Sequence, residues 1–361
     1  MDNTISAVVS SANSVPLISV ALPVYNGEQH LAESIESILG QSFSDFEFII
    51  INDGSTDGSL EILRKYEQAH PCIRLVSREN RNVAATLNEI AQMARGEWIA
   101  RIDQDDIAVP DRFEKQLQWL AHTGADICGS WIRTFGAGSE LVISHAQSDA
   151  AVKMEMLFCS PLAHPSVMMR KSVLSQLQYN EVGWQAEDYD LWVRAAEAGW
   201  KMTNVPEVLL RYRQHANQIS TKSNRAQQSL SCSIRRRYWH YVFTRLQLDV
   251  SLIDEVLKLR DAEGQNADMD RVVCAFSGLL SHSEGEARLV VFDHMRRLFI
   301  RAAAACPNSA TRWQRLCKQY EYPVKKETLL ILWLLSVLRI GPDGRVFHRL
   351  KAFYLSLLAR F

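Results

Sequence analysis

Residues 98–113 have the sequence WIARIDQDDIAVPDRF, in which an apolar run leads directly into a cluster of aspartates. Residues 98–102 are typical of a short buried strand, and Asp103, Asp105 and Asp106 follow where that strand ends. Carboxylates this close together repel one another and are costly to bury, so a protein usually gives them a cation or a basic partner. The stretch therefore predicts a strand whose carboxyl end carries a binding site.

The same pattern of apolar run, polar turn and helical segment occurs upstream. We expect strands at residues 17–24, 46–51, 72–76 and 98–102, with helices at 28–39, from 60 onward, and at 83–94. Further strands are expected at 126–135, 165–169 and 202–212, with a helix at 187–198. This alternation predicts an α/β fold, with a mostly parallel, Rossmann-like sheet covered by helices on both faces.

Composition indicates a globular chain of more than one part. Of its 361 residues, 47% are hydrophobic and 22% are charged, which is typical of a protein with a large core. We expect a flexible leader at residues 1–16, a first domain at 17–222 and a helical region at 223–361. Nothing in the chain indicates a nucleic-acid partner.

Cysteine usage and the N-terminus indicate the compartment. The seven cysteines are scattered and form no C-x-x-C pair, which favours reduced thiols over a disulfide framework or a zinc site. The first residues lack the basic segment of a signal peptide. We therefore expect a cytoplasmic protein.

The aspartates after residue 102 are candidate metal ligands. Asp103 and Asp105 are one residue apart, so in an extended segment they point to the same side. Two such oxygen ligands, with room for phosphate oxygens, are how Mg²⁺ or Mn²⁺ is usually held beside a diphosphate. The alternative is a helix-start cluster, with Asp106 or Asp111 capping the helix that begins near Pro110. Capping explains Asp111 but leaves Asp103 and Asp105 unexplained.

Two other polar segments follow predicted strands, where ligands bind in parallel sheets. Tyr25 and Asn26 follow the first strand, and Asp53 follows the second. A carboxylate at the position of Asp53 is able to accept the N–H of a pyrimidine base; the alternative is a turn and helix cap, which fits the residues after it. The chain has no G-x-G-x-x-G and no P-loop pattern, so a nucleotide would be held mainly by side chains and a cation.

Glu187 and Asp188 form a third acidic group, in the segment QAEDYDLW. Either carboxylate favours the start of a helix electrostatically, which is a purely structural role. Alternatively, either one would serve as the base that takes a proton from an acceptor hydroxyl.

Together these segments resemble the family 2 glycosyltransferases with a GT-A fold, in particular those of bacterial polysaccharide and O-antigen synthesis. The matching segments, in the order of the family, are ISVALPVYNGE, FIIINDGSTDGSLEIL, ARGEWIARIDQDDIAVPDRFEKQL, HPSVMMR and EDYDLWVRAAEAG. The resemblance implies a metal-dependent, inverting transfer of a sugar from a nucleotide donor, commonly a UDP-sugar, with Mn²⁺ or Mg²⁺.

The resemblance also implies roles for individual residues. Asp53 would contact the uracil, in a nucleotide pocket lined by Pro23, Val24, Tyr25 and Asn26. Asp103 and Asp105 would form the D-x-D motif, with Asp105 as the direct metal ligand, Asp103 near the ribose and diphosphate, and Arg101 steadying the acidic cluster. The base is assigned to Asp188, with Glu187 as the alternative.

Three further positions match the family less closely. His215, in YRQHANQIS, corresponds to a position that contacts the metal or the diphosphate in some relatives, although a single histidine is more often structural. His164 and Ser166 match a segment that borders the acceptor and donor-sugar pocket. Asn82 stands where relatives often have glycine, and asparagine tolerates unusual backbone angles.

The end of the chain is apolar and basic. Residues 328–340 are almost unbroken apolar residues, and Phe347, Leu350, Tyr354, Leu357 and Phe361 then recur at helical steps among cations. We expect amphipathic helices at 327–361 that contact the inner face of a membrane, or else pack on the protein or on a second subunit. A polyprenyl-linked glycan would then be a suitable acceptor, with the arginines at 235–237 facing its diphosphate or lying on a solvated helix surface.

Two other functions are compatible with parts of the sequence. A sugar nucleotidylyltransferase has a glycine-rich, basic loop near the first strand, but no Lys or Arg precedes Arg64 in this chain. A catalytically inactive scaffold that binds sugar nucleotides would not need Asp103, Asp105 and Asp188.

Overall fold

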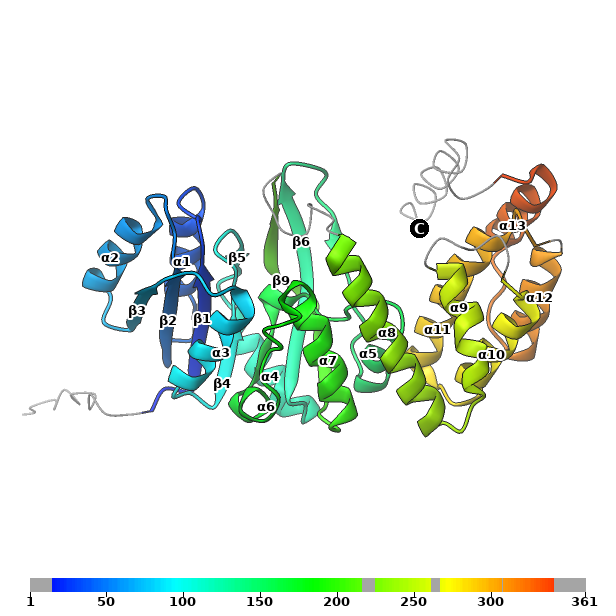
Figure 1. Cartoon of the computed structure of the whole chain (residues 1–361), viewed down its shortest axis with the longest axis horizontal. Helices are drawn as coiled ribbons and strands as arrows, with labels where there is room; N and C mark the ends of the chain where they lie inside the picture. The colour runs from blue at the N-terminus through cyan, green and yellow to red at the C-terminus, as the bar shows by residue number, and fades with distance from the viewer. Residues whose placement is uncertain (1–14, 216–224, 261–266, 307, 341–361) are drawn as a thin grey trace, which may run out of the picture. The chain divides into compact units, whose positions relative to one another are not determined.

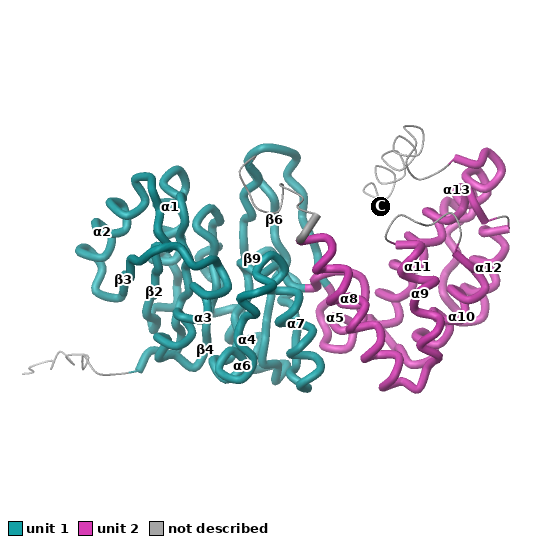
Figure 2. The backbone as a smooth tube through the Cα atoms, viewed as in Figure 1, with its two compact units in different colours: residues 1–145, 162–223 teal, residues 146–161, 224–361 magenta. Residues whose placement is uncertain are grey.

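The computed structural model describes residues 15–215, 225–260, 267–306 and 308–340 (Figure 1). Most of the expected leader and the periodic segment from Phe347 to Phe361 lie outside this part. The described chain consists of two compact units, formed by residues 1–145 with 162–223 and by residues 146–161 with 224–361 (Figure 2).

The first unit is built on one mixed sheet. Within the described residues its strand order is β3-β2-β1-β4-β8-β6-β9-β5, and β7 pairs with β6. The neighbouring strands β3, β2, β1 and β4 are all parallel, and β9 is parallel to β6. The strands β8, β5 and β7 are antiparallel to their partners. The predicted α/β fold with a mostly parallel sheet is confirmed. Its strands are β1 (Ile18–Val24), β2 (Phe46–Asp53), β3 (Ile73–Arg78), β4 (Trp98–Arg101), β5 (Ile107–Ala108), β6 (Ile127–Gly136), β7 (Val142–Ile143), β8 (Met168–Arg170) and β9 (Met202–Gln214).

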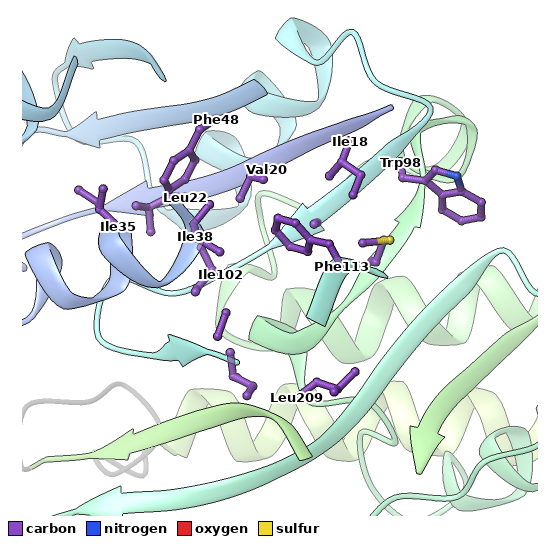
Figure 3. Close-up of a cluster of buried hydrophobic side chains, with 14 of the residues drawn as sticks. Ile18, Val20, Leu22, Ile35, Ile38, Phe48, Trp98, Ile102, Phe113 and Leu209 are labelled. Atoms are coloured by element: carbon purple, nitrogen blue, oxygen red, sulfur yellow. The ribbon is translucent and has the colours of Figure 1, made fainter. Parts of the chain in front are cut away.

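Helices cover both faces of this sheet because its central strands are apolar on both sides. One face packs against α1 and α4 in the core drawn in Figure 3, which includes Val20, Leu22, Phe48, Ile38 and Phe113. Alternate residues such as Ile49 and Ile51 are also buried, on the face that α3 covers. The helical segments of this unit are α1 (Leu31–Leu39), α2 (Ser59–Ala69), α3 (Val83–Met93), α4 (Arg112–Thr123), η1 (His164–Ser166), α6 (Lys171–Leu177), η2 (Trp184–Ala186) and α7 (Glu187–Glu197).

Two local predictions differ from the structure. The strand expected at 165–169 begins only at Met168, because Pro165 has no N–H and both the N–H and the hydroxyl of Ser166 bond back to the carbonyl of Ala163 at 2.8 Å. Asp111 occupies the N-cap of α4, but its side chain makes no cap hydrogen bond and pairs with Lys115 at 2.9 Å.

The second unit is helical. Its segments are α5 (Asp149–Glu155), α8 (Arg225–Arg245), η3 (Val250–Leu252), α9 (Ile253–Arg260), α10 (Met269–Ser281), α11 (Gly285–Ala302), α12 (Ser309–Gln319) and α13 (Lys326–Leu338). The sequence analysis places residues 146–161 in the first domain, at 17–222. In the structure they pack with the helical unit instead. Glu286 of α11 accepts the N–H of Gln147 at 2.7 Å, and Trp239 of α8 donates to the carbonyl of Leu157 at 2.6 Å. Such long-range pairs leave no local signal in the sequence.

Three further features of the described chain bear on the sequence predictions. The arginines at 235–237 do not form one solvated patch, because Arg235 is buried while Arg236 is exposed and paired with Asp254. All seven cysteines are free thiols. Among the described residues, no helix combines the length and the apolar character needed to cross a membrane.

Candidate active site

Strands that run in one direction end at the same edge of the sheet, and four of them carry candidate residues at or next to their carboxyl ends. β1, β2 and β4 are parallel, and β9 has the same direction because β8 is antiparallel to both β4 and β6 while β9 is parallel to β6 (Figure 1). The residues at this edge are Val24, Asp53, Arg101 and Gln214. Ligands of parallel sheets bind beyond such an edge, so the candidate site lies here.

Asp53 ends β2 and is buried, so its charge requires partners. Its Oδ1 accepts hydrogen bonds from Nη1 of Arg78 and, at 2.9 Å, from the backbone N of Arg81. Arg78, at the end of β3, also donates from Nε to Glu89 at 2.7 Å. A carboxylate and a guanidinium thus lie paired at the ends of β2 and β3, both of them largely buried.

Gln104 joins the loop after β1 to the loop after β4. Its Nε2 donates to the carbonyl of Tyr25 at 3.0 Å, and its Oε1 accepts from the N–H of Tyr25 at 2.8 Å. The side chain of Asn26 accepts from the N–H of Thr56 at 2.8 Å, which ties the same loop to the one after β2. Tyr25 itself is half exposed.

Arg101 and Asp103 form a two-armed ion pair directly after β4. Nη2 of Arg101 lies 2.7 Å from Oδ1 of Asp103, and Nη1 lies 3.1 Å from Oδ2. The guanidinium is buried, whereas the carboxylate is part exposed. The hydroxyl of Ser34 fixes the same turn by donating to the carbonyl of Asp103 at 2.7 Å. Asp103 is therefore oriented before any ligand binds.

Asp105 contacts His215, which follows β9. Nε2 of His215 lies 2.8 Å from Oδ2 of Asp105, and Nε of Arg213 donates to the carbonyl of Asp105 at 2.8 Å. The ring of His30 lies 5.5 Å from the ring of His215, and burial lowers the pKa of His30. Arg213 and His215, at the end of β9, thus lie against the aspartate cluster.

Asp106 differs from its two neighbours because it is completely buried. Burial, followed by the charges of Asp103 and Asp105, raises the pKa of Asp106 well above its usual range. Its Oδ1 accepts the N–H of Arg213 at 2.9 Å, and its Oδ2 has no partner in the described chain. Burial therefore favours the neutral form of Asp106, which supports the loop through its contact with Arg213.

The donor set fits a divalent cation. Oxygen atoms of Asp103, Asp105 and Asp106 lie within 4.8 Å of one another, and the imidazole of His215 is adjacent to Asp105. Carboxylate oxygens suit Mg²⁺ and Mn²⁺, and an additional imidazole nitrogen is tolerated better by Mn²⁺. Asp103, Asp105 and His215 are the residues that would hold the ion.

Glu187 begins α7 in a buried polar cluster. Its Oε1 lies 3.6 Å from Nδ1 of His164, and Nε2 of His164 is 2.9 Å from the hydroxyl of Tyr179. Burial raises the pKa of Glu187 to about 7 and lowers the pKa of His164 to about 3. The histidine is neutral at pH 7, so its contact with Glu187 is not an ion pair.

Arg101 connects the two acidic groups electrostatically. Burial works against its charge, but the fields of Asp103, Tyr179, Glu187 and Asp188 outweigh burial and raise its pKa. One buried guanidinium is therefore within electrostatic reach of the aspartate cluster and of the start of α7. The charge of Arg101 is thus favoured by both acidic groups, and it is paired directly with Asp103.

Arg112 of α4 supports this arrangement from inside the protein. Its Nη2 donates to the carbonyl of Arg101 at 2.7 Å, and its Nε donates to Gln116 at 3.0 Å. Burial lowers the pKa of Arg112 to about 9. A buried arginine that bonds to the end of β4 holds the strand end in place.

Comparison with known proteins now identifies the family. A profile described as Glycosyl transferase family 2 matches residues 19–177. EpsE of Bacillus subtilis (strain 168), a glycosyltransferase by name, is 35% identical over 221 residues, which are 58% of this chain and 78% of EpsE. The chain belongs to glycosyltransferase family 2.

Other family 2 relatives have similar coverage. An uncharacterized glycosyltransferase of Haemophilus influenzae is 31% identical over 67% of this chain and 79% of its own length. The O-antigen biosynthesis glycosyltransferase WbnJ of Escherichia coli is 31% identical over 57% of this chain and 83% of its own length. The solved structure of S. aureus TarS 1-349 in complex with UDP-GlcNAc has a TM-score of 0.53 and 14% identity, over 89% of this chain and 91% of that chain. At this identity the likeness shows the fold, which is GT-A-like with a helical C-terminal region.

The structure places the residues predicted for the nucleotide pocket and its surroundings at different depths. Val24 is buried in the core, so only its backbone is available to a ligand, and Pro23 is part buried. Ser166 is also buried, and its hydroxyl accepts the N–H of Ser130 at 3.1 Å. Asn82 adopts the positive φ of +86° that favours glycine, and its side chain caps α3 by accepting the N–H of Ala85 at 3.1 Å.

Residues that the sequence analysis did not single out also shape the site. Arg78, Gln104, Arg213 and Tyr179 contact predicted site residues but were not predicted themselves. Arg78 lies at a strand end, which was a usable signal. The others are identified only by contacts between distant segments.

Proposed function

We propose that this family 2 enzyme transfers a sugar from a UDP-sugar to a hydroxyl of a glycan acceptor, with inversion at the anomeric carbon. The observation that carries the proposal is that Arg101 lies within reach of two acidic groups, Asp103 on one hand and the pair Glu187 and Asp188 on the other. A displacement needs both a site for the departing diphosphate and a base for the attacking hydroxyl.

Uridine recognition is assigned to the ends of β1, β2 and β3. Uracil has an N–H between two carbonyl groups, so a carboxylate acceptor beside a cationic donor complements it. Asp53 and Arg78 provide this pair, and the half-exposed ring of Tyr25 provides a surface for stacking. A purine base would not present the same edge.

The diphosphate is assigned to the aspartate cluster. Asp103, Asp105 and His215 would hold Mn²⁺ or Mg²⁺, and the bound cation would neutralise charge on the departing diphosphate. Arg101 orients Asp103, and the carbonyl of Asp105 is fixed by Arg213. These contacts organise the loop in advance, which reduces the cost of binding.

The base is assigned to Asp188. Glu187 is held against His164 in the buried cluster, where its proton is retained up to about pH 7, so it serves as a neighbour that limits charge at the start of α7. Asp188 removes the proton of the acceptor hydroxyl as that oxygen attacks from the face opposite the diphosphate. A single displacement of this kind inverts the anomeric centre.

The acceptor is assigned to the glycans that polysaccharide synthesis extends. Relatives include the O-antigen biosynthesis enzyme WbnJ, and the chain covers most of its length. We therefore propose a glycan, or a glycan carried on a polyprenyl lipid, as the acceptor. The relatives leave the donor sugar and the linkage open.

The proposal is tested with purified protein, a panel of UDP-sugars and acceptor glycans, with Mn²⁺ present. We expect transfer with an inverted anomeric configuration in the product, measured by NMR coupling constants. Asp188→Asn should lower the turnover number by about 10³-fold or more and leave UDP affinity unchanged. Asp111→Asn, at the part-exposed N-cap position of α4, is the matched control. A retained configuration, or full activity in Asp188→Asn, would contradict the assignment; UDP binding without any transfer would favour the scaffold function.

A further inference from the structure

Helix α13 has no polar face. Thr328, Leu332 and Leu335 are buried on the side that packs against α11 and α12. Yet the opposite side is equally apolar, with exposed fractions of 56% at Leu330, 55% at Trp333, 58% at Val337 and 59% at Leu338. We call these four residues the outer face of α13. A surface helix of a soluble protein normally carries polar residues on such a side.

The spacing shows that the outer face is continuous. Leu330, Trp333 and Val337 follow one another at three and four residues, which places them on one side of a helix, and Leu338 adjoins them. Large apolar side chains gathered in this way mark an interaction surface, whereas exposed residues scattered singly do not. α13 is labelled beside α12 in Figure 1.

Cations flank the outer face at both ends. Lys325 and Lys326 precede it and Arg339 follows it, all of them exposed, with Glu327 as the single acidic residue in residues 325–340. The surface is therefore apolar in its middle and positive at its margins.

We propose that the outer face of α13 lies in the headgroup region of an anionic lipid bilayer. An apolar helix side edged by Lys and Arg inserts its hydrophobic residues at the boundary of the acyl chains while its cations meet anionic headgroups. Tryptophan is enriched at that depth, and Trp333 lies within the face. The thirteen residues of α13 rise about 20 Å, less than the ~30 Å core of a bilayer, which suits a helix lying along the surface.

Charge favours a bilayer over a second copy of the chain. A symmetric contact through the outer face would bring Lys325, Lys326 and Arg339 of one copy near the same cations of the other. Like charges across an interface oppose association. An anionic surface complements all of these cations at once, and it would place the enzyme beside a lipid-carried acceptor. The inference does not depend on the proposed chemistry, because its test needs no sugar substrate.

The first test is flotation of the full-length protein with vesicles of phosphatidylglycerol and phosphatidylethanolamine, compared with phosphatidylcholine. We expect binding to the anionic vesicles that weakens about tenfold or more on neutral vesicles or at high salt. Leu330→Glu and Trp333→Glu should each weaken binding about tenfold or more. Leu289→Glu, at a 54% exposed position on α11, is the matched control and should bind as the wild type does.

The second test locates the contact. Vesicles with brominated acyl chains should quench part of the tryptophan emission, and Trp333→Phe should remove that quenching while flotation is retained. Absence of flotation, or flotation without quenching, would overturn the proposal. It would also be overturned if Leu330→Glu floated normally while Arg349→Glu/Lys351→Glu did not, since the segment after residue 340 would then carry the contact. Sedimentation that showed a dimer dissociated by Leu330→Glu, with no lipid binding, would assign the face to a second copy.

Discussion

Nε2 of His215 lies 2.8 Å from Oδ2 of Asp105, although 110 residues separate the two in the chain. The contact arises because β9 runs in the same direction as β4 and ends at the same edge of the sheet. It places an imidazole beside the aspartate cluster, which the sequence could propose only from family resemblance. Several measurable consequences follow from this and from related contacts.

Loss of either partner should weaken metal-dependent nucleotide binding. We expect Asp105→Asn to lower UDP affinity in Mn²⁺ by about 100-fold, because a charged ligand is removed, and His215→Ala to lower it by about tenfold. Titration calorimetry with and without Mn²⁺ measures both effects. EDTA should reduce the wild type to the affinity of Asp105→Asn, and Asp111→Asn should bind normally. UDP affinity that is indifferent to Mn²⁺ in the wild type would disprove the cation site.

The buried carboxyl of Glu187 should make stability depend on pH. Burial raises its pKa from an ordinary 4.5 to about 7, so the folded state binds this proton more tightly than the unfolded chain does. The wild type therefore loses stability as pH rises between these values, by on the order of 3 kcal/mol. Glu187→Gln, which stays neutral, should be more stable than the wild type above pH 7 by up to that amount and equal to it near pH 4.

Urea unfolding at pH 5, 6, 7 and 8 measures the Glu187 effect. Glu61→Gln is the control, because Glu61 is exposed on α2 and its substitution should give a difference that does not change across this range. If the Glu187→Gln and wild-type curves ran parallel from pH 5 to pH 8, the carboxyl would not be buried in protonated form.

Arg78 should matter for both stability and nucleotide binding. Its guanidinium pairs with Asp53 and Glu89, and Arg78→Met leaves the buried carboxylate of Asp53 without its cation. We expect a loss of about 3 kcal/mol in the free energy of unfolding and a weaker affinity for UDP by about tenfold or more. Arg64→Met, at an exposed position of α2, should change neither quantity. Normal UDP affinity in a folded Arg78→Met variant would show that Arg78 has no role in recognising the uracil.

Gly54 and Gly124 separate backbone strain from crowding. Both have positive φ, of +77° and +63°, but a Cβ at Gly54 would lie 2.7 Å from the backbone N of Asn80, whereas nothing lies within 4 Å at Gly124. Gly124→Ala should cost about 1 kcal/mol, since only the backbone conformation is disfavoured. Gly54→Ala should cost about 2 kcal/mol more, because the turn after β2 must also shift. Equal losses in thermal unfolding would show that this turn adapts freely.

The sequence predicted most of the first unit because its signals are local. The runs at residues 18–24 and 46–53 are apolar at most consecutive positions. Such runs are typical of strands buried on both faces of a parallel sheet, so this burial could be predicted from the sequence. The short strands β5 and β7 have two residues each and carry no period, so no pattern could predict them. The prediction of a strand at 165–169 was wrong at its start. Pro165 and Ser166 form a turn there, in which the hydroxyl of Ser166 donates to the carbonyl of Ala163.

For the candidate site, the sequence by itself determined which carboxylates stand at strand ends, because Asp53, Asp103 and Asp105 directly follow buried runs. Only the tertiary structure decided what meets them. Arg78 reaches Asp53, His215 reaches Asp105, and Glu187 is enclosed with His164 and Tyr179. These pairings depend on strand order and on side chains from distant segments, and local periodicity carries no information about either. Burial sets the protonation of Asp106 and Glu187 for the same reason, since it is a property of the packed fold.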